Sequence, residues 1–259
     1  MKIRHLLFPP KCVVCRSILD TDKYEVLADK RITLPFCEKC GEEFYKITHE
    51  KCNICGEDKI NCTCLTEGLI GSCDILLKLG SYTKRKRDAM AKTITALKHR
   101  TRRVAEDYIA YLLGRELMRC FCEYEISDPM ITFIPRTKSG MRVNGYDHAE
   151  RVARKVADFC NIEFCECFTR RAFGVEQKTL GYEERKTNAN RSIVKGKNMP
   201  LLAGRCVVIF DDIVTSGASL ARAGEIAKEH GAESVVGLCI AVTRTGRVNK
   251  KSHHEAELW

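Results

Sequence analysis

The sequence predicts an α/β fold with a parallel sheet, preceded by a small Cys-rich module, and two observations support this organisation. After residue 75, short apolar runs alternate with segments of helical periodicity. Continuous apolar runs are typical of parallel strands that are buried on both faces. Before residue 76 the cysteines are concentrated, because nine of the 16 lie there. The predicted domains are therefore residues 1–75 and 76–259.

The composition places the chain among globular proteins. It has 259 residues, of which 44% are hydrophobic and 30% charged, and this excludes disordered and collagen-like chains. No apolar run is long enough to span a membrane, and the N-terminus lacks a signal-peptide core, so we expect a cytoplasmic protein. The net charge of +10 belongs to residues 76–259, which hold 33 Lys and Arg against 22 Asp and Glu.

Eight of the nine N-terminal cysteines form four close pairs, three spaced C-x-x-C and one C-x-C. A C-x-x-C turn brings two thiolates to one side, as tetrahedral zinc requires, and four cysteines make a closed structural site. The pairs therefore predict two structural Zn²⁺ sites. Pairing in chain order gives the ligand sets Cys12, Cys15, Cys37 and Cys40, and Cys52, Cys55, Cys62 and Cys64. Cys73 is an alternative to Cys62 or Cys64.

A strongly basic stretch opens the second domain. Residues 78–103 contain ten Lys and Arg and one acid, Asp88. Met90, Ile94 and Leu97 recur at helical spacing, so we interpret the stretch as a basic turn followed by a basic amphipathic helix. Such a helix is either a solvated face or a site for a polyanion such as nucleic acid.

The remaining elements follow from periodicity, turn residues and caps. Asp147 is the predicted N-cap of a helix, and the His148 that follows it is expected on the surface. Residues 169–200 are polar and irregular, which favours a functional loop. The predicted helices are 105–118, 147–159 and 220–230, and the predicted strands are 130–134, 162–167, 206–210 and 234–242.

The segment 207–220 carries the clearest chemical pattern. Four apolar residues deliver Asp211 and Asp212 to the end of a strand, and small and hydroxyl residues then lead into a helix. A helix N-terminus with a glycine binds phosphate, whereas the two carboxylates suit sugar hydroxyls or Mg²⁺. The pattern therefore indicates a ribose 5-phosphate site rather than an ordinary turn with chance acids. The phosphate-binding candidates are Thr215, Ser216, Gly217, Ala218 and Ser219.

The string 207–219 resembles the 5-phosphoribosyl 1-pyrophosphate (PRPP) signature of type I phosphoribosyltransferases. The opening Leu7-Phe8-Pro9-Pro10-Lys11-Cys12-x-x-Cys15, together with Leu97-Lys98, Ile134-Pro135-Arg136, Gln177-x-x-Leu180 and Glu184-Arg185-x-x-Asn188, is similar to the ComF family. That family comprises bacterial double-zinc-ribbon proteins linked to competence and DNA uptake. This chain departs from the family pattern at Asn144-Gly145-Tyr146-Asp147-His148 and at Thr215-Ser216-Gly217-Ala218-Ser219.

The resemblance implies a type I phosphoribosyltransferase fold preceded by a double zinc ribbon. It implies displacement of pyrophosphate from C1 of the ribose, with Mg²⁺ and PRPP bound together. In these roles Asp211 and Asp212 hold the ribose hydroxyls directly or through Mg²⁺. Arg136 and Lys138 contact the pyrophosphate, and the 169–200 loop, including Arg170, Arg171, Gln177 and Arg185, closes over the site.

The resemblance also supports a second interpretation, in which the PRPP pocket is regulatory or vestigial. The protein is then an adaptor that binds single-stranded DNA and other proteins of the competence machinery. The DNA contacts would be Lys84, Arg85, Lys86 and Arg87, in the basic stretch. Neither interpretation identifies the acceptor of the phosphoribosyl group.

Overall fold

A five-stranded parallel sheet forms the centre of the protein. The structure, a computed structural model, describes residues 9–19, 24–27, 30–83, 87–97, 103–136, 146–171 and 192–243. The strand order is β3-β9-β8-β4-β5, and every neighbouring pair is parallel. The predicted α/β fold class is therefore confirmed. The strands are β3 (Ile75–Tyr82), β4 (Pro129–Phe133), β5 (Glu163–Phe164), β8 (Cys206–Val214) and β9 (Ser234–Thr243).

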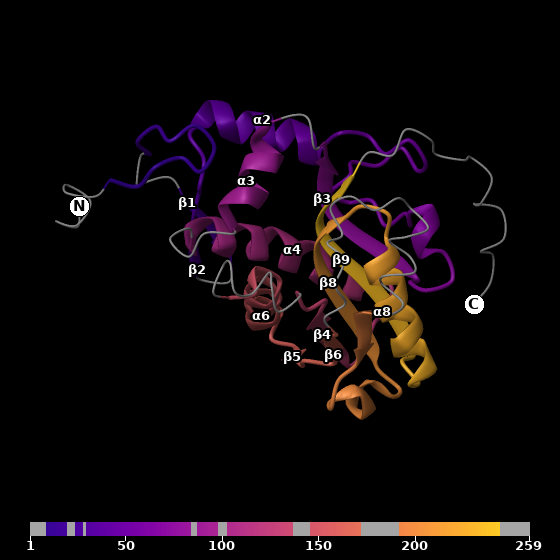
Figure 1. Cartoon of the computed structure of the whole chain (residues 1–259). Coiled ribbons are helices and arrows are strands. Elements are labelled where there is room, and N and C mark those ends of the chain that lie inside the picture. Colours follow the sequence, from indigo (N-terminus) through magenta and orange to yellow (C-terminus); the bar gives the residue numbers. More distant parts are fainter. Residues whose placement is uncertain are drawn as a thin grey trace.

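Helices cover both faces of the sheet (Figure 1). Helices α4 (Arg103–Glu123) and α6 (His148–Cys160) lie on one face, and α8 (Ala218–Glu229) lies on the other. Alternate residues of β8 point to opposite faces of the sheet. Val208 and Phe210 pack in the core with α4 and α6, and Val207 and Ile209 pack in the core with α8. The continuous apolar runs in the sequence thus reflect burial on both sides.

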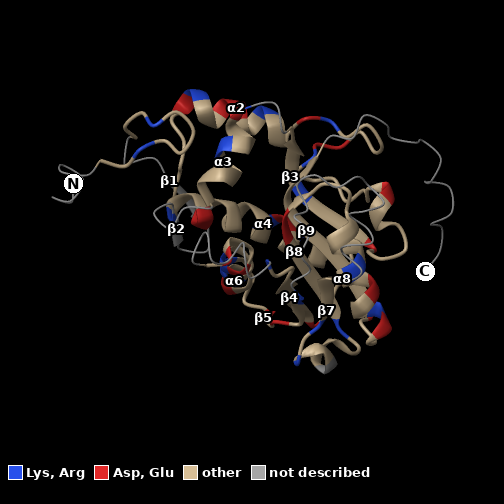
Figure 2. Ribbon diagram, in the orientation of Figure 1, with Lys and Arg blue, Asp and Glu red and all other residues tan. Residues whose placement is uncertain are grey.

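The Cys-rich segment adds small elements around one edge of this sheet. Strands β1 (Tyr24–Leu27) and β2 (Lys30–Thr33) form an antiparallel pair. Helix α2 (Glu38–Thr48) packs against α3 (Ala89–Leu97) and β3, and the short helix η1 (Glu67–Leu69) contacts α8. The exposed surface of α2 carries charges of both signs (Figure 2).

The predicted irregular loop 169–200 contains regular structure at both of its ends. Strands β6 (Phe168–Arg170) and β7 (Ile193–Lys195) form an antiparallel ribbon, and the short helix η3 (Met199–Leu202) follows. Each of these strands has only three residues. Such short strands, in which polar residues are mixed with apolar ones, leave no pattern from which the pairing could be predicted. Residues 172–191, which include Gln177 and Arg185, lie outside the described residues.

The basic stretch 78–103 begins as a strand, which the sequence analysis did not predict. Lys78 lies inside β3, where it is 7% exposed, so it contributes nothing to a basic surface. The predicted amphipathic helix is present as α3, with Met90, Ile94 and Leu97 buried. Lys84, Arg85 and Lys86 lie outside the described residues, and Arg87 is exposed. Within the described ranges, no helix combines the length and hydropathy needed to cross a membrane.

Candidate functional site

The acidic pair lies where β8 extends beyond the end of its neighbour β4. The pairing of β8 with β4 ends at Phe210, whereas its pairing with β9 continues to Val214. Strand β8 is therefore longer than predicted and contains Asp211 and Asp212 within it. Because β4 has already ended, this part of β8 is open on one side. It lies at the carboxyl ends of the parallel strands, where ligands bind in open α/β sheets.

Both carboxylates are held by backbone N–H groups of the next residue. The Asp212 N–H donates to Asp211 Oδ1 and the Ile213 N–H to Asp212 Oδ1, each at 2.9 Å. Burial raises the pKa of Asp211 well above its usual range, the neighbouring Asp212 charge adds to this, and the Arg170 guanidinium opposes it. Two carboxyl groups thus share a poorly solvated site, in which a bound cation would favour the ionised form of Asp211.

The loop after β8 ends at an uncapped helix. Gly217 is the N-cap of α8 with a φ of 78°, and no side chain caps the helix there. The Ala218 N–H donates to Ser216 Oγ at 3.4 Å. A Cβ at position 217 would lie 3.2 Å from Leu69 Cδ2 as well as being strained. All five predicted phosphate-binding residues therefore lie together at the positive end of a helix dipole.

Asp212 is linked to β4 and α6 by two further side chains. His148 Nε2 lies 2.7 Å from Asp212 Oδ2, and Arg136 Nη2 lies 2.8 Å from the same histidine nitrogen. Arg136 Nη2 is also 3.4 Å from Asp212 Oδ2. Asp147, the N-cap of α6, accepts from the Ala149 and Arg136 N–H groups at 2.9 and 2.8 Å. The predicted cap is present, and it fixes the chain that leaves β4.

Arg170 connects the β6–β7 ribbon to the phosphate loop. Its Nη1 lies 3.4 Å from Pro135 O and its Nη2 lies 3.4 Å from Ser219 Oγ. Burial lowers the pKa of Arg170, and the Asp211 charge opposes this shift. A second cation therefore contacts the first turn of α8 and interacts with the charge of Asp211.

The structure brings most of the predicted site residues together and adds one, while the loop residues Gln177 and Arg185 lie outside the described residues. Lys138 lies outside the described residues. His148 was expected on the surface and is instead 1% exposed, with its Nδ1 buried and unpartnered among the described residues. The sequence showed only that His148 directly follows the predicted cap residue Asp147, and this did not indicate that the histidine is buried.

Two sets of four cysteines come together in the N-terminal segment. They are Cys12, Cys15, Cys37 and Cys40, and Cys52, Cys55, Cys62 and Cys64, and the sulfur atoms of each set lie within 4.8 Å of one another. These are the sets that pairing in chain order gives, and Cys73 is in neither. The Cys15–Cys37 and Cys55–Cys62 Sγ distances are both 3.6 Å. Tetrahedral zinc with Zn–S bonds of about 2.3 Å requires about 3.8 Å, so both donor sets fit the ion.

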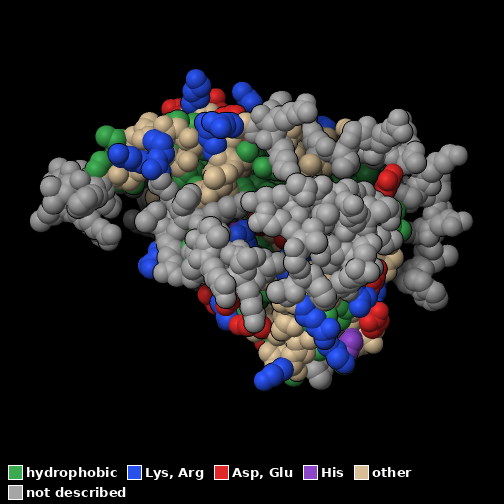
Figure 3. All heavy atoms as spheres, viewed as in Figure 1, with side chains coloured by type: hydrophobic (Ala, Val, Ile, Leu, Met, Phe, Trp, Pro, Cys, Tyr) green, Lys and Arg blue, Asp and Glu red, His purple; other side chains and the backbone are tan. Residues whose placement is uncertain are grey.

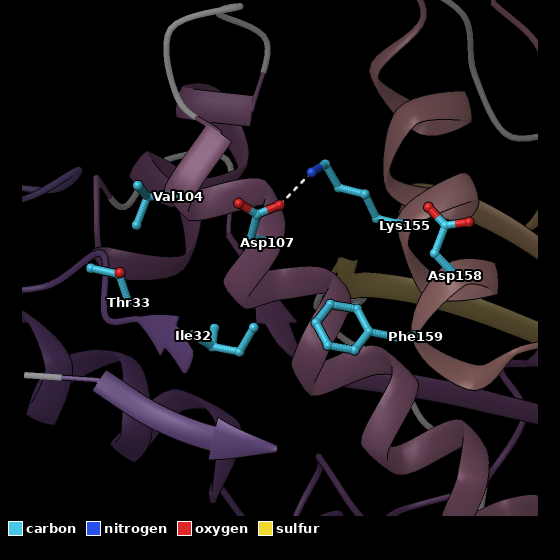
Figure 4. Close-up of a pocket in the computed structure, with 7 residues that line it drawn as sticks. All are labelled: Ile32, Thr33, Val104, Asp107, Lys155, Asp158 and Phe159. Atoms are coloured by element: carbon cyan, nitrogen blue, oxygen red, sulfur yellow. Dashed lines mark hydrogen bonds and ion pairs between the residues drawn. The ribbon is translucent and has the colours of Figure 1, made fainter. Parts of the chain in front are cut away.

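The larger cavity lies away from the carboxyl ends of the strands. It has a volume of about 360 Å³ and lies between β2, α4 and α6, with Ile32 and Phe159 facing it and the Asp107–Lys155 ion pair beside it (Figure 4). A second cavity of about 230 Å³ lies between residues 67–72 and the start of α8, next to Ser216. Of these two cavities, the second adjoins the phosphate loop.

Comparison with known proteins identifies the class of domain that contains the phosphate loop. Residues 142–258 match the phosphoribosyl transferase domain family, and this segment contains β8, the phosphate loop, α8 and β9. The chain therefore has a phosphoribosyltransferase-like domain, preceded by two four-cysteine clusters. No curated protein sequence matches the chain.

Several solved structures are similar to about half of the chain. A phosphoribosylpyrophosphate synthetase from Mycobacterium smegmatis is 16% identical over 52% of this chain and 33% of its own, with a TM-score of 0.33. A purine phosphoribosyltransferase from Pyrococcus horikoshii is 18% identical over 56% and 78%, with a TM-score of 0.32. A hypoxanthine phosphoribosyltransferase from Staphylococcus aureus is 12% identical over 57% and 70%, with a TM-score of 0.33. The chain spans about a third of the length of the synthetase.

Proposed function

We propose that the second domain binds PRPP with Mg²⁺ at the carboxyl end of β8 and transfers its phosphoribosyl group to an acceptor. One observation carries the proposal, which is that two carboxylates on an open strand edge are followed directly by the uncapped N-terminus of α8. Carboxylates suit ribose hydroxyls or Mg²⁺ and a helix N-terminus suits a phosphate, so the two features together suit a sugar that carries a 5-phosphate. The match of residues 142–258 to the phosphoribosyl transferase domain supports the same assignment.

The proposed roles follow from the charge of each group. Asp211 and Asp212 accept hydrogen bonds from the ribose hydroxyls or hold Mg²⁺, which when bound neutralises charge on the pyrophosphate. The N–H groups and hydroxyls of residues 215–219 bind the 5-phosphate. Arg136, whose Nη2 lies 3.4 Å from Asp212 Oδ2, would attract the leaving pyrophosphate, a role that Lys138 would share. Arg170, next to Ser219, adds a cation beside the phosphate.

Catalysis of this kind depends on positioning and on charge rather than on a protein nucleophile. Displacement at C1 passes through a transition state with positive charge on the sugar, so a site with fixed anionic groups beneath the ribose stabilises it. The backbone N–H groups that hold Asp211 and Asp212 keep both carboxyl groups in place before the substrate arrives. The acceptor site is not assigned.

Calorimetric titration of PRPP with Mg²⁺ tests this proposal. Wild-type protein is expected to bind, and the Asp211→Asn/Asp212→Asn variant to lose at least tenfold in affinity. The matched control is Glu42→Gln/Glu43→Gln, which removes an adjacent pair of exposed acids on α2 and should bind like the wild type. A folded wild-type protein that does not bind PRPP would contradict the proposal.

We also propose that both cysteine clusters bind structural zinc. All four donors at each site are thiolates, so each ion would have a complete coordination shell and no open position for chemistry. Purified protein is expected to contain two zinc ions per chain by elemental analysis. Protein that retains no zinc when purified without chelators would contradict this assignment.

The similarity of the sequence motifs to the ComF family extends the proposal to competence and DNA uptake. In that role the protein would act as an adaptor, with Lys84–Arg87 binding single-stranded DNA. Neutralising those four residues is expected to weaken DNA binding and to flatten its dependence on salt. The control is Lys39→Gln/Lys46→Gln on α2, in the region where Figure 3 shows other exposed Lys and Arg side chains. Unchanged affinity and salt slope would remove the basic stretch from this role.

A further inference from the structure

Lys78 is a lysine inside the protein whose burial requires an explanation. It lies in β3 beside Cys239 of β9 and is 7% exposed. Its side chain points to the face that carries Leu76 and Cys239, where η1 and α8 pack. An ammonium group is almost never buried unless a negative partner compensates for its lost hydration.

The contacts of Lys78 lead to the second cysteine cluster. Its Nζ donates to Cys62 O at 3.1 Å, to Cys64 O at 3.0 Å and to Leu76 O at 3.3 Å. It also donates to Cys62 Sγ at 3.3 Å. Across the described part of the chain, no carboxylate forms an ion pair with Lys78. Among the atoms that Lys78 Nζ contacts, the Cys62 sulfur is the one that can carry a negative charge, as it would when a metal is bound.

A zinc ion with four thiolates carries two negative charges in excess, and this charge is costly where the site is shielded from water. Each cluster has one exposed cysteine, Cys15 in the first and Cys55 in the second. Cys15 Sγ contacts Ser17 Oγ at 3.1 Å, whereas Cys62 Sγ accepts from Lys78 Nζ at 3.3 Å. The two sites therefore differ in their surroundings. The second cysteine cluster is next to the buried ammonium of Lys78, whereas the sulfur of Cys15 in the first cluster contacts the hydroxyl of Ser17.

We propose that Lys78 is the counter-cation of the second metal site, compensating its excess negative charge and fixing the Cys62–Cys64 turn on the central sheet. The proposal rests on zinc occupying this cluster. Charge-assisted N–H···S bonds stabilise the thiolate against protonation, so the metal should leave this site more slowly than it would without the lysine. The carbonyl contacts have a mechanical effect as well, since they tie both ends of the C-x-C turn to β3.

The test compares zinc release from the wild type and from Lys78→Met, a variant of similar length without the charge. A colorimetric chelator follows release, and thiol alkylation with peptide mapping assigns each step to a cluster. We expect Lys78→Met to release one of its two zinc ions at least tenfold faster than the wild type does. Cys52, Cys55, Cys62 and Cys64 should be the cysteines that are alkylated first. Lys78→Arg, which keeps the charge, should restore much of the slow phase.

Lys59→Met is the matched control, because Lys59 lies near the same cluster but donates to Glu50 and Ser81 and not to a thiolate. It should release both ions at wild-type rates. If Lys78→Met released both zinc ions at wild-type rates, with the four thiols still protected from alkylation, the proposal would be overturned. Protein without any zinc would instead refute the metal assignment itself.

A measurement on the wild type covers the case in which Lys78→Met does not fold. Amine labelling followed by peptide mapping should leave Lys78 unmodified in the zinc-loaded protein. After chelation it should be modified, while exposed Lys51 is labelled equally under both conditions. Equal labelling of Lys78 with and without zinc would show that the metal site does not engage the ammonium, and would overturn the proposal.

Discussion

At the scale of single residues, Gly224 shows how closely the Cys-rich segment packs against α8. Gly224 lies within α8, and a Cβ at this position would lie 2.3 Å from Ser72 O and 3.0 Å from Ser72 C. Ser72 is itself buried and donates to Leu69 O at 2.9 Å, so its backbone cannot easily move. The absence of a side chain is what lets the two segments touch.

The substitution Gly224→Ala is therefore expected to destabilise the protein by about 1–3 kcal/mol, although alanine is the better helix former. Urea denaturation would measure the change. The control is Gly41→Ala in α2, where the new Cβ would lie 3.7 Å from Phe36 Cβ, an ordinary contact. That variant should be more stable than the wild type by up to about 1 kcal/mol. A neutral Gly224→Ala would mean that the Ser72 segment moves freely.

The candidate site could be predicted in part from individual residues. Asp211, Asp212 and the loop 215–219 were predictable because their chemistry is contiguous in the chain. The contact of His148 with Asp212 was not, since the two are far apart in sequence and an isolated histidine carries no periodic signal. Burial of Lys78 was equally hidden, because a lysine among basic neighbours is normally solvated.

At the scale of secondary structure, α6 is the element that joins the sheet to the site. Its cap residue Asp147 accepts both the Ala149 N–H and the Arg136 N–H. One carboxylate thus begins the helix and holds the chain that leaves β4. Arg136 and His148, which meet at Asp212, are both positioned by this single side chain.

Replacing the cap is expected to loosen both connections. Asp147→Ala should cost about 1–2 kcal/mol of stability from the lost cap alone and should weaken PRPP binding, because Arg136 is no longer fixed. The comparison is Asp158→Ala, which removes an exposed acid from the last turn of the same helix and should change stability by less than about 0.5 kcal/mol. Thermal unfolding and calorimetry would separate the two effects. Equal stability of the two variants would contradict the capping role.

Among the elements, the sequence predicted best those whose pattern is local. Helices α4, α6 and α8 and strands β4, β8 and β9 appear near their expected positions, because caps and apolar periodicity mark them. Strand β3 was missed, since a lysine interrupts its apolar run. The β6–β7 ribbon was missed because its pairing spans residues 171–192 and depends on contacts that no local pattern reveals.

At the scale of the whole molecule, the boundary predicted at residue 75 is crossed by many contacts. The Leu76 N–H donates to Thr63 O at 3.1 Å, Leu69 packs beside Gly217, and the Lys228 ammonium pairs with Asp74 at 2.7 Å. The second cysteine cluster therefore lies against the layer that supports the phosphate loop. The division into domains 1–75 and 76–259 stays a prediction.

Removal of metal is consequently expected to affect both parts of the chain. Chelation should lower the unfolding temperature of the α8 layer as well as that of the Cys-rich segment, and should reduce PRPP affinity, because Leu69 loses its support. Differential scanning calorimetry with and without chelator would measure this, and restored zinc should reverse it. A transition of the second domain that is unaffected by chelation would show that the two parts are energetically independent.

The pairing of β3 with β9 also has a consequence for the order of events during synthesis. Ile75 pairs with Val236 and Tyr82 with Thr243. The first strand of the sheet to be synthesised, β3, therefore cannot pair until the last one, β9, has been made. Until then β3 exposes unpaired backbone groups and apolar side chains, which favours aggregation. The nearby cysteines can meanwhile coordinate metal through local contacts alone. Early metal binding would therefore fold the segment next to β3 and limit its aggregation until β9 has been synthesised.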